Sequence, residues 1–258
     1  RFRAFSIVQS PNVLGSYMAL LIPLVIGFFF FEKNRRWKVF WLFSMLILTM
    51  CLLATLSRGA WLAFAASILF FSILIDRRMF IVALIAGLLV VTMVPQVSER
   101  ISYLFSATYL EKSAEDGRIA RWGGALDQVR NEPFFGRGLG HYGGAVAQRQ
   151  LGITYVDNYY AKTMAETGLL GLTLYLWLLL SLLWKAYQLL QRYHQKDPRL
   201  SWILRGLLTG LVAVLLHNGV ENIFEVPFMH TYFWFLAGSL LALPYLKDGD
   251  KEVAAGYE

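Results

Sequence analysis

The chain alternates long apolar runs with short charged segments. Seven of these runs approach the roughly 20 residues that an α-helix needs to cross a bilayer. The third and fourth runs are short, and Arg205 and His217 interrupt the sixth. The pattern predicts an all-α, polytopic membrane protein, organised as a single domain over residues 1–258. Its helical bundle would have about seven transmembrane helices, at residues 13–31, 37–56, 60–75, 79–94, 168–190, 202–219 and 229–245.

Composition supports a membrane protein. Hydrophobic residues make up 57% of the chain and charged residues only 16%, whereas soluble domains have about a quarter charged residues. The single cysteine, Cys51, lies in an apolar run, which excludes a disulfide framework or a cysteine metal site. We expect no metal and no cofactor. The chain opens on Arg1 without an initiator Met or a signal pattern, so we expect it to be the C-terminal portion of a longer protein.

Basic residues mark one side of the predicted bundle. Segments 32–38, 76–78 and 191–199 and the tail after Tyr245 fall on the same side if the spans alternate, and this side is then cytoplasmic. The long segment 96–167 becomes an extracytoplasmic, partly helical loop. Its basic and acidic residues balance, so the formal charge of +7 is mostly a topology signal. The expected partner is therefore the lipid bilayer and not nucleic acid.

The outer segment contains a predicted amphipathic helix. An apolar stripe lies between Asp116-Gly117 and Pro133 and predicts a helix on the membrane surface. The stripe consists of Ile119, Trp122, Leu126 and Val129. Arg118 and Arg121 would share a face of this helix, either as solvated surface charges or as ligands for an anion.

A glycine-rich segment, "FFGRGLGHYGG", follows this helix. Its glycines superficially resemble a dinucleotide loop, but no cytosolic strand precedes them, and a turn between helices is favoured. His141 is the lone histidine of this segment, and a structural role is favoured over catalysis.

Arg58, in "TLSRGAWL", falls in a very short outward loop between two spans, where the charge bias disfavours arginine. Its planar fork suits a phosphate group, and snorkelling to lipid headgroups is the alternative. Arg1 and Arg3 also fall outside the bilayer in this topology. Together these arginines could form one anion-binding site.

Two polar residues, Asp157 and Asn158, precede the fifth span. Either could cap the helix 159–167, and a carboxylate here could also accept a proton from a sugar hydroxyl. Glu166 could act in the same way, or pair with Lys162 one helical turn earlier. The stretch "LLHNGVEN" adds polar groups, including Glu221, at the outer end of the sixth span.

Four segments together resemble the O-antigen ligase/polymerase family of bacterial surface polysaccharide assembly. The resemblance covers most of the chain, and the four segments occur in the family's order. The family's ligases have His where this chain has Asp157, which favours the polymerase-like members, and its members usually have more spans, which would precede Arg1. The segments are "RAFSIVQSPNVLGSYMALLIPL", "LSRGAWLA", "RIARWGGALDQVRNEPFFGRGLGHY" and "DNYYAKTMAETGLLG".

The resemblance implies a membrane glycosyltransferase of the GT-C kind in the bacterial cytoplasmic membrane, with its active site on the extracytoplasmic side. It would polymerise or ligate cell-envelope polysaccharide from a polyprenyl-diphosphate-linked oligosaccharide donor to a glycan or lipid-glycan acceptor. The implied catalytic residues are Asp157 and Glu166. The implied diphosphate- and glycan-binding residues are Arg3, Arg58, Arg118, Arg121, Asn158 and His141.

The alternative function is a transporter of a small anion such as bicarbonate. Transport predicts polar residues at the middle of the membrane and interrupted helices. The predicted spans carry almost no charge at their centres, and the polar residues gather at their outer ends. This distribution favours glycosyl transfer.

Overall fold

The computed structural model describes residues 3–4, 10–75, 77–153 and 155–255, and their regular structure is helical. Arg1 lies outside the described residues. The helices, in chain order, are α1 (Pro11–Phe31), α2 (Arg35–Ala54), α3 (Arg58–Ile75), α4 (Arg77–Met93), α5 (Pro95–Leu104), α6 (Ala107–Glu115), α7 (Arg118–Asn131), α8 (Ala145–Leu151), α9 (Tyr159–Lys196), α10 (Pro198–Asn218), the 3₁₀ helix η1 (Ile223–Glu225) and α11 (Pro227–Ala255).

Each of the seven predicted apolar runs coincides with a helix, so the all-α prediction is confirmed for the described residues. Four helices, α1, α2, α9 and α10, are long and apolar enough to cross a membrane, and α3 is apolar but shorter. The total of seven spans stays a prediction. The exposed surface is apolar where lipid is expected, as Ile47 on α2 and Trp177 on α9 illustrate (64% and 68% exposed). Apolar side chains on the outside of a helical bundle are typical of a membrane domain.

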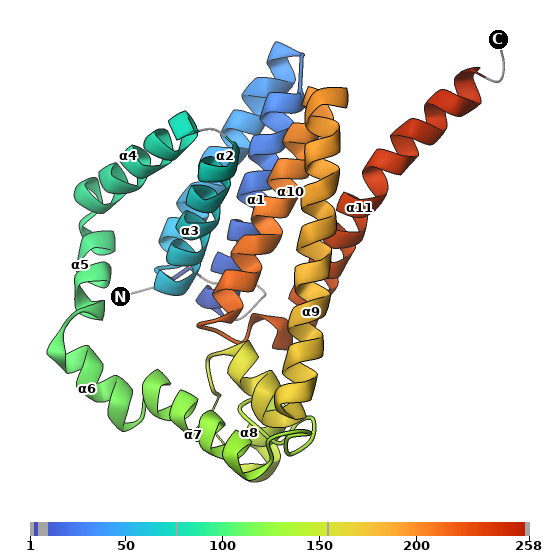
Figure 1. Cartoon of the computed structure of the whole chain (residues 1–258). Coiled ribbons are helices and arrows are strands. Elements are labelled where there is room, and N and C mark those ends of the chain that lie inside the picture. Colours follow the sequence, from blue (N-terminus) through green and yellow to red (C-terminus); the bar gives the residue numbers. More distant parts are fainter. Residues whose placement is uncertain (1–2, 5–9, 76, 154, 256–258) are drawn as a thin grey trace.

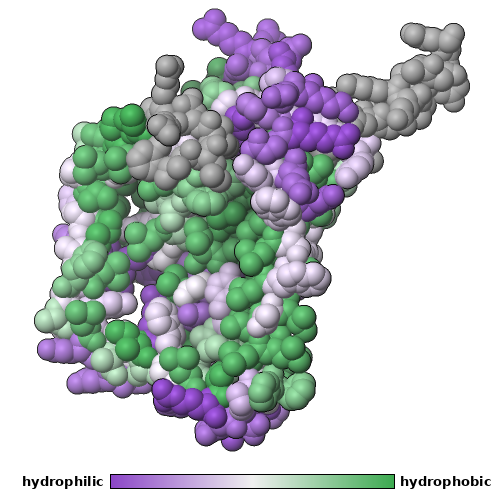
Figure 2. Space-filling model, in the orientation of Figure 1, coloured by the Kyte–Doolittle hydropathy of each residue, from purple (hydrophilic) through white to green (hydrophobic). Residues whose placement is uncertain are grey.

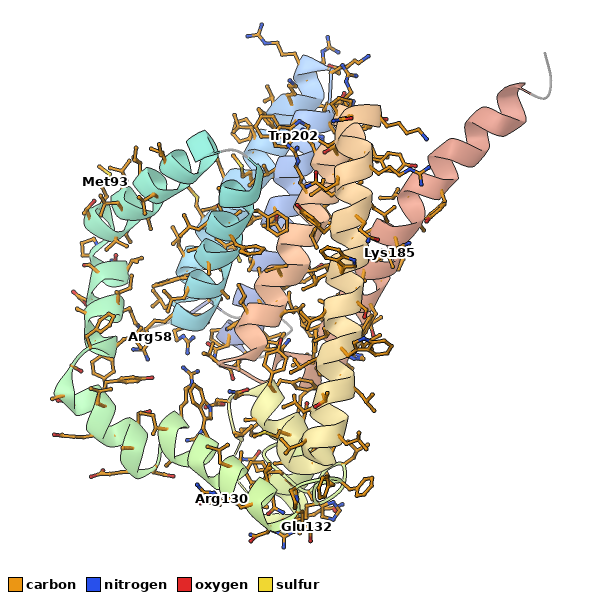
Figure 3. The ribbon with its side chains drawn as sticks, viewed as in Figure 1. Arg58, Met93, Arg130, Glu132, Lys185 and Trp202 are labelled. Atoms are coloured by element: carbon orange, nitrogen blue, oxygen red, sulfur yellow. The ribbon has the colours of Figure 1, made fainter. Side chains whose placement is uncertain are left out.

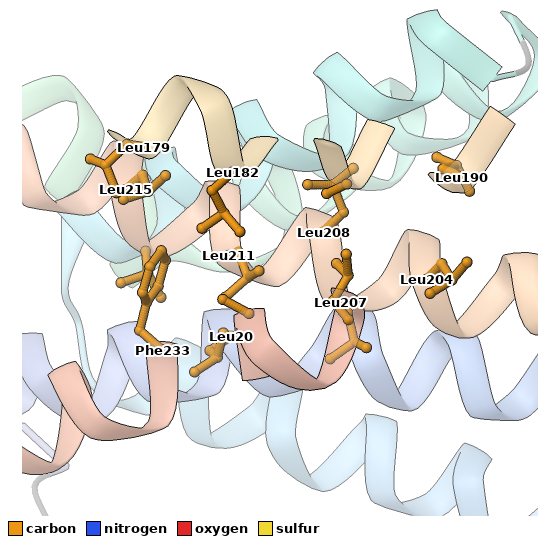
Figure 4. Close-up of a cluster of buried hydrophobic side chains, with 14 of the residues drawn as sticks. Leu20, Leu179, Leu182, Leu190, Leu204, Leu207, Leu208, Leu211, Leu215 and Phe233 are labelled. Carbon is orange, nitrogen blue, oxygen red and sulfur yellow. The ribbon is translucent and has the colours of Figure 1, made fainter. Parts of the chain in front are cut away.

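Helices α1 and α10 form the centre of the bundle, and glycines let their backbones approach closely. A Cβ atom at Gly206 or Gly210 would collide with the backbone oxygen of Pro23 or Leu20. Small residues at such a contact are the usual means of close helix packing in membranes. Around it, leucines of α9 and α10 pack against Leu20 of α1 and Phe233 of α11 (Figure 4).

Helices α4, α5, α6 and α7 form an arch beside the bundle. Helix α4 diverges from the end of α3, and α5, α6 and α7 continue from it to the opposite end of the bundle (Figure 1). The space-filling view shows the surface hollowed between this arch and the bundle, with hydrophilic residues inside the hollow (Figure 2). The α1–α2 and α9–α10 connections, which hold the basic segments, lie at the other end of the bundle (Figure 1). Segments 32–38 and 191–199 thus lie at the same end of the bundle, and the side of the membrane that this end faces stays a prediction.

Helix α9 is interrupted at Gly168, where the backbone has φ +68° and ψ −173°. The glycine-rich segment crosses α9 at this point and satisfies the backbone groups that the interruption frees. The amides of Arg137 and Gly138 donate to the carbonyls of Ala165 and Glu166 (3.1 and 2.9 Å). The Leu169 amide, at the start of the second part of α9, donates to the Pro133 carbonyl (2.8 Å). The predicted turn is thus confirmed, and it attaches the outer segment to α9.

Candidate functional site

A cavity of about 340 Å³ lies where the arch meets the end of the bundle. It is formed by the start of α3, by α5, α6 and the beginning of α7, and by the residue that precedes the cap of α9. Figure 3 shows Arg58 at the start of α3, near the space between α3 and α5. Cationic and aromatic side chains dominate the wall. The lining residues are Arg58, Tyr103, Tyr109, Lys112, Ser113, Gly117, Arg118, Arg121 and Asp157.

Helix α7 presents two arginines to Asp157. Arg121 donates from Nη1 to the Asp157 carboxylate (3.0 Å), and Arg118 lies 3.8 Å from the same oxygen. The three side chains are each about a quarter exposed, so the group is accessible from the cavity. Asp157 has a left-handed backbone (φ +51°), which Asp and Asn tolerate better than most residues. The predicted shared face of Arg118 and Arg121 is confirmed, and both residues bind a carboxylate.

The buried face of α7 differs from the predicted apolar stripe. Ala125 and Val129 are buried, and Trp122 packs beside Ala125 and donates to the Val156 carbonyl (3.1 Å). Ile119 and Leu126, which the stripe included, are about half exposed. The helix packs against α9, so its contact face is rotated from the one that apolar periodicity indicated.

Glu221 connects the site to the first span. Its carboxylate pairs with Arg118 (3.3 Å) and accepts a hydrogen bond from the side-chain amide of Asn12 at the start of α1. Asn12 in turn accepts from Arg3 (2.8 Å), whose Nε donates to the Thr55 carbonyl (3.0 Å). Arg3 is therefore part of the site through Asn12 and Glu221, and it does not line the cavity.

Burial raises the pKa of Glu221 to about 7, and the neighbouring Asp157 carboxylate raises it as well. Arg118 and the hydrogen bond from Asn12 oppose this shift because both favour the ionised form. The carboxyl group of Glu221 therefore changes its protonation near neutral pH.

Arg58 has aromatic partners in place of an acidic one. Its guanidinium lies over the rings of Tyr103 on α5 and Tyr109 on α6, with its central carbon 5.4 and 5.2 Å from their centroids. Among the described residues no carboxylate pairs with it, and its buried Nη1 has no hydrogen-bond partner. Lys112 of α6 also lines the cavity. Arg58 and Lys112 therefore give the cavity wall positive charge that no described carboxylate neutralises.

Besides Arg3, three other predicted site residues lie outside the cavity. Glu166 is buried beside Lys162 (2.5 Å) and accepts from the amides of Gly140 and Tyr142 (2.9 and 3.2 Å), so it holds the glycine-rich segment in place. Asn158 is the N-cap of α9 and accepts from two backbone amides of the first turn. His141 is exposed, and its Nδ1 lies 3.2 Å from the Leu139 carbonyl. The geometry gives these residues structural contacts, and their roles in substrate binding or catalysis stay predictions.

The structure adds residues that sequence reasoning did not select. Glu221 and Asn12 were visible only as polar positions in "LLHNGVEN" and "SPN", and Tyr103, Tyr109 and Lys112 gave no distinct signal. None of the described residues form a group of three or more His, Cys, Asp or Glu side chains placed to hold a metal ion. The charged groups at this site are the cations of the cavity wall and the carboxyl groups of Asp157 and Glu221.

A comparison with protein-family models matches residues 43–176 to the family described as O-antigen ligase. The match covers just over half of the chain, from α2 to the middle of α9, and includes Arg58, Arg118, Arg121 and Asp157. A search of curated proteins gave no match. With its long apolar helices, the chain is a multi-pass membrane protein, and it belongs to the O-antigen ligase family.

Proposed function

We propose that this protein is a membrane glycosyltransferase that polymerises or ligates surface polysaccharide at the outer face of the bacterial cytoplasmic membrane. Its donor is a glycan linked to a polyprenyl diphosphate, and its acceptor is a hydroxyl of a second glycan or lipid-linked glycan. The observation that carries the proposal is the cavity itself. It combines positive charge at Arg58 and Lys112, which pairs with no carboxylate among the described residues, with an accessible carboxylate at Asp157, at one end of an apolar bundle.

The cationic wall suits a diphosphate. Arginine donates parallel hydrogen bonds in a planar fork that matches phosphate oxygens. Arg58 is held between Tyr103 and Tyr109, so its guanidinium is oriented before a substrate arrives. Groups that are fixed in advance stabilise the charge that develops on a leaving group most effectively. The polyprenyl chain would lie along the apolar surface of the neighbouring helices.

In the reaction, the acceptor hydroxyl oxygen forms a bond to the anomeric carbon of the donor sugar. The bond between that carbon and the diphosphate oxygen breaks, and its electron pair leaves with the lipid diphosphate. The hydroxyl proton passes to the carboxylate of Asp157, which acts as general base. Arg58 and Lys112 stabilise the negative charge of the leaving group, while Arg118 and Arg121 orient Asp157. The reaction as written consumes no nucleotide and no redox reagent.

An anion transporter is less well supported by the arrangement of charge. Transporters place substrate-binding polar groups near the middle of the membrane, often at broken helices. Here the cavity and its ion pairs lie at one end of the bundle, where the arch meets α3 and α7.

The replacement Asp157→Asn tests the proposal. Asn fits the left-handed backbone and cannot accept the proton, and the cap of α9 is supplied by Asn158. We expect glycan transfer from a lipid-diphosphate donor in reconstituted membranes to fall roughly a hundredfold or more, the usual contribution of a general base. Asp157→His should retain part of the activity, because the family's ligases have His at this position.

Asp127→Asn is the matched control. Asp127 lies on the exposed side of α7 and pairs with Arg130 (2.8 Å), so this change also removes one carboxylate and one ion pair from the outer segment. Transfer by the control should stay near the wild-type rate. An Asp157→Asn variant with wild-type transfer, at equal membrane abundance, would exclude Asp157 as the base.

A further inference from the structure

Glu221 occupies the junction of the segments that build the site. It lies between α10 and η1, and its side chain is only 16% exposed. It contacts Asn12 at the start of α1 and Arg118 at the start of α7. These partners are 209 and 103 residues away in the sequence. The protonation of this carboxyl group can therefore affect its contacts with both α1 and α7.

Arg118 is shared between Glu221 and Asp157. It lies 3.3 Å from an oxygen of Glu221 and 3.8 Å from an oxygen of Asp157. Both carboxyl groups therefore lie against the same guanidinium, and the neighbouring Asp157 raises the pKa of Glu221. Adjacent carboxylates repel each other when both are ionised, so such a pair tends to retain one proton.

We propose that Glu221 is a positioning residue that forms a proton-sharing carboxyl pair with Asp157 and thereby sets the ability of Asp157 to accept a proton. The proposal rests on the proposed function, because it assigns Asp157 the role of general base. Glu221 does not line the cavity, so it acts through Asp157 and Arg118.

The charge of Glu221 determines whether it weakens or strengthens Asp157 as a base. When Glu221 is protonated, it donates a hydrogen bond to Asp157, occupies one of its lone pairs and weakens it as a base. When Glu221 is ionised, its negative charge raises the affinity of Asp157 for the proton of the acceptor hydroxyl. The raised pKa of Glu221, about 7, places this change near neutral pH. Transfer should therefore increase as the pH rises through this range.

The other charged and titratable groups around the pair affect the pH at which Glu221 loses its proton. Arg118 and Arg3 favour the ionised form of Glu221, and Arg121 binds the Asp157 side of the pair. His217, buried on the last turn of α10, lies near Arg118. Asn12 donates to Glu221 and stabilises its ionised form without being titratable itself.

The first test is the pH dependence of glycan transfer in wild-type protein and in Glu221→Gln. With a pKa of about 7, Glu221 is about half ionised at pH 7 and about one tenth ionised at pH 6, so the wild-type rate should fall about fivefold between these pH values. Glu221→Gln should lack this dependence. At alkaline pH its rate should stay as low as the rate of the wild type at acidic pH. Asn12→Ala removes a donor to the carboxylate and should move the rise to higher pH.

Glu225→Gln is the matched control. Glu225 lies in the same segment and pairs with Lys162 (3.3 Å), outside the cavity. This variant should keep the wild-type pH dependence, even if its yield is lower. A Glu221→Gln variant with the wild-type rise in rate would overturn the proposal. So would an Asn12→Ala variant whose rise stays in place.

A second measurement does not depend on activity. Infrared spectra of the reconstituted protein without substrate should show a carboxylic acid C=O band that is lost as the pH rises through about 7. The band should be absent in Glu221→Gln and present in Glu225→Gln. A titrating band in protein that transfers no glycan would refute the proposed function and leave the carboxyl pair intact. Active wild-type protein without such a band would refute the pair alone.

Discussion

Replacing Gly168 by alanine tests how the outer segment is attached to the bundle. Gly168 has φ +68° and ψ −173°, a combination that is almost restricted to glycine and costs other residues about 1–3 kcal/mol. An added Cβ would also collide with the backbone of Phe134, at the point where the glycine-rich segment crosses α9. We therefore expect Gly168→Ala to weaken the cross-chain hydrogen bonds as well.

The expected loss of stability is the sum of the backbone strain and the weakened hydrogen bonds. The crossing includes four backbone hydrogen bonds between residues 133–138 and 165–170. Each contributes about 1 kcal/mol, so loss of even one or two, added to the strain, gives a destabilisation of about 3 kcal/mol. For a chain of this size, about 1 kcal/mol lowers the Tm by roughly 2–4 °C. The expected change in Tm is therefore a decrease of roughly 6–12 °C.

The assay is thermal unfolding in detergent, together with limited proteolysis of the glycine-rich segment. Gly123→Ala is the matched control, because Gly123 lies within α7 and a Cβ there would meet no atom within 4 Å. That change should be neutral or stabilise the protein by up to about 1 kcal/mol. A Gly168→Ala variant with the wild-type Tm and an equally protected segment would refute the interpretation of the crossing.

Two further predictions concern the cationic wall and the topology. Arg58→Lys keeps the charge but loses the planar fork, so glycan transfer at equal abundance should fall about tenfold to a thousandfold, and a wild-type rate would contradict diphosphate binding. In a variant in which Cys51 is replaced, cysteines at Asn34 and Lys196 should be protected from a membrane-impermeant thiol reagent in intact cells, whereas one at Gln148 should react. The reverse labelling would place the cavity on the cytoplasmic side.

Much of the local structure was predictable from the sequence because it depends on near neighbours. The apolar runs correspond to helices, since length and hydrophobicity are local properties. Asp116-Gly117 and Pro133 correctly indicated the limits of α7, and the Gly168 position correctly separated 159–167 from the following apolar helix.

Part of the candidate site was predictable for the same reason. Arg58 and Asp157 drew attention because they lie at the ends of apolar spans, and Arg118 and Arg121 because they share a helix face; all four line the cavity. Arg3 reaches the same network through Asn12. Glu166, selected as a possible base, and His141, the lone histidine of the glycine-rich segment, lie outside the cavity, because the sequence does not state which way that segment folds.

Only the tertiary structure decided which charges meet. The sequence by itself determined the helices, the polar character of one end of the bundle and the family. Periodicity indicates which residues share a helix face, but not which face meets a distant segment. The contacts of Glu221 with Asn12 and Arg118, and of Arg58 with Tyr103 and Tyr109, depend on how α1, α7 and the arch pack around α10. These long-range contacts turn isolated charges into a cavity with a cationic wall and a carboxyl pair, because the energy of a charge depends on the neighbours that folding brings to it.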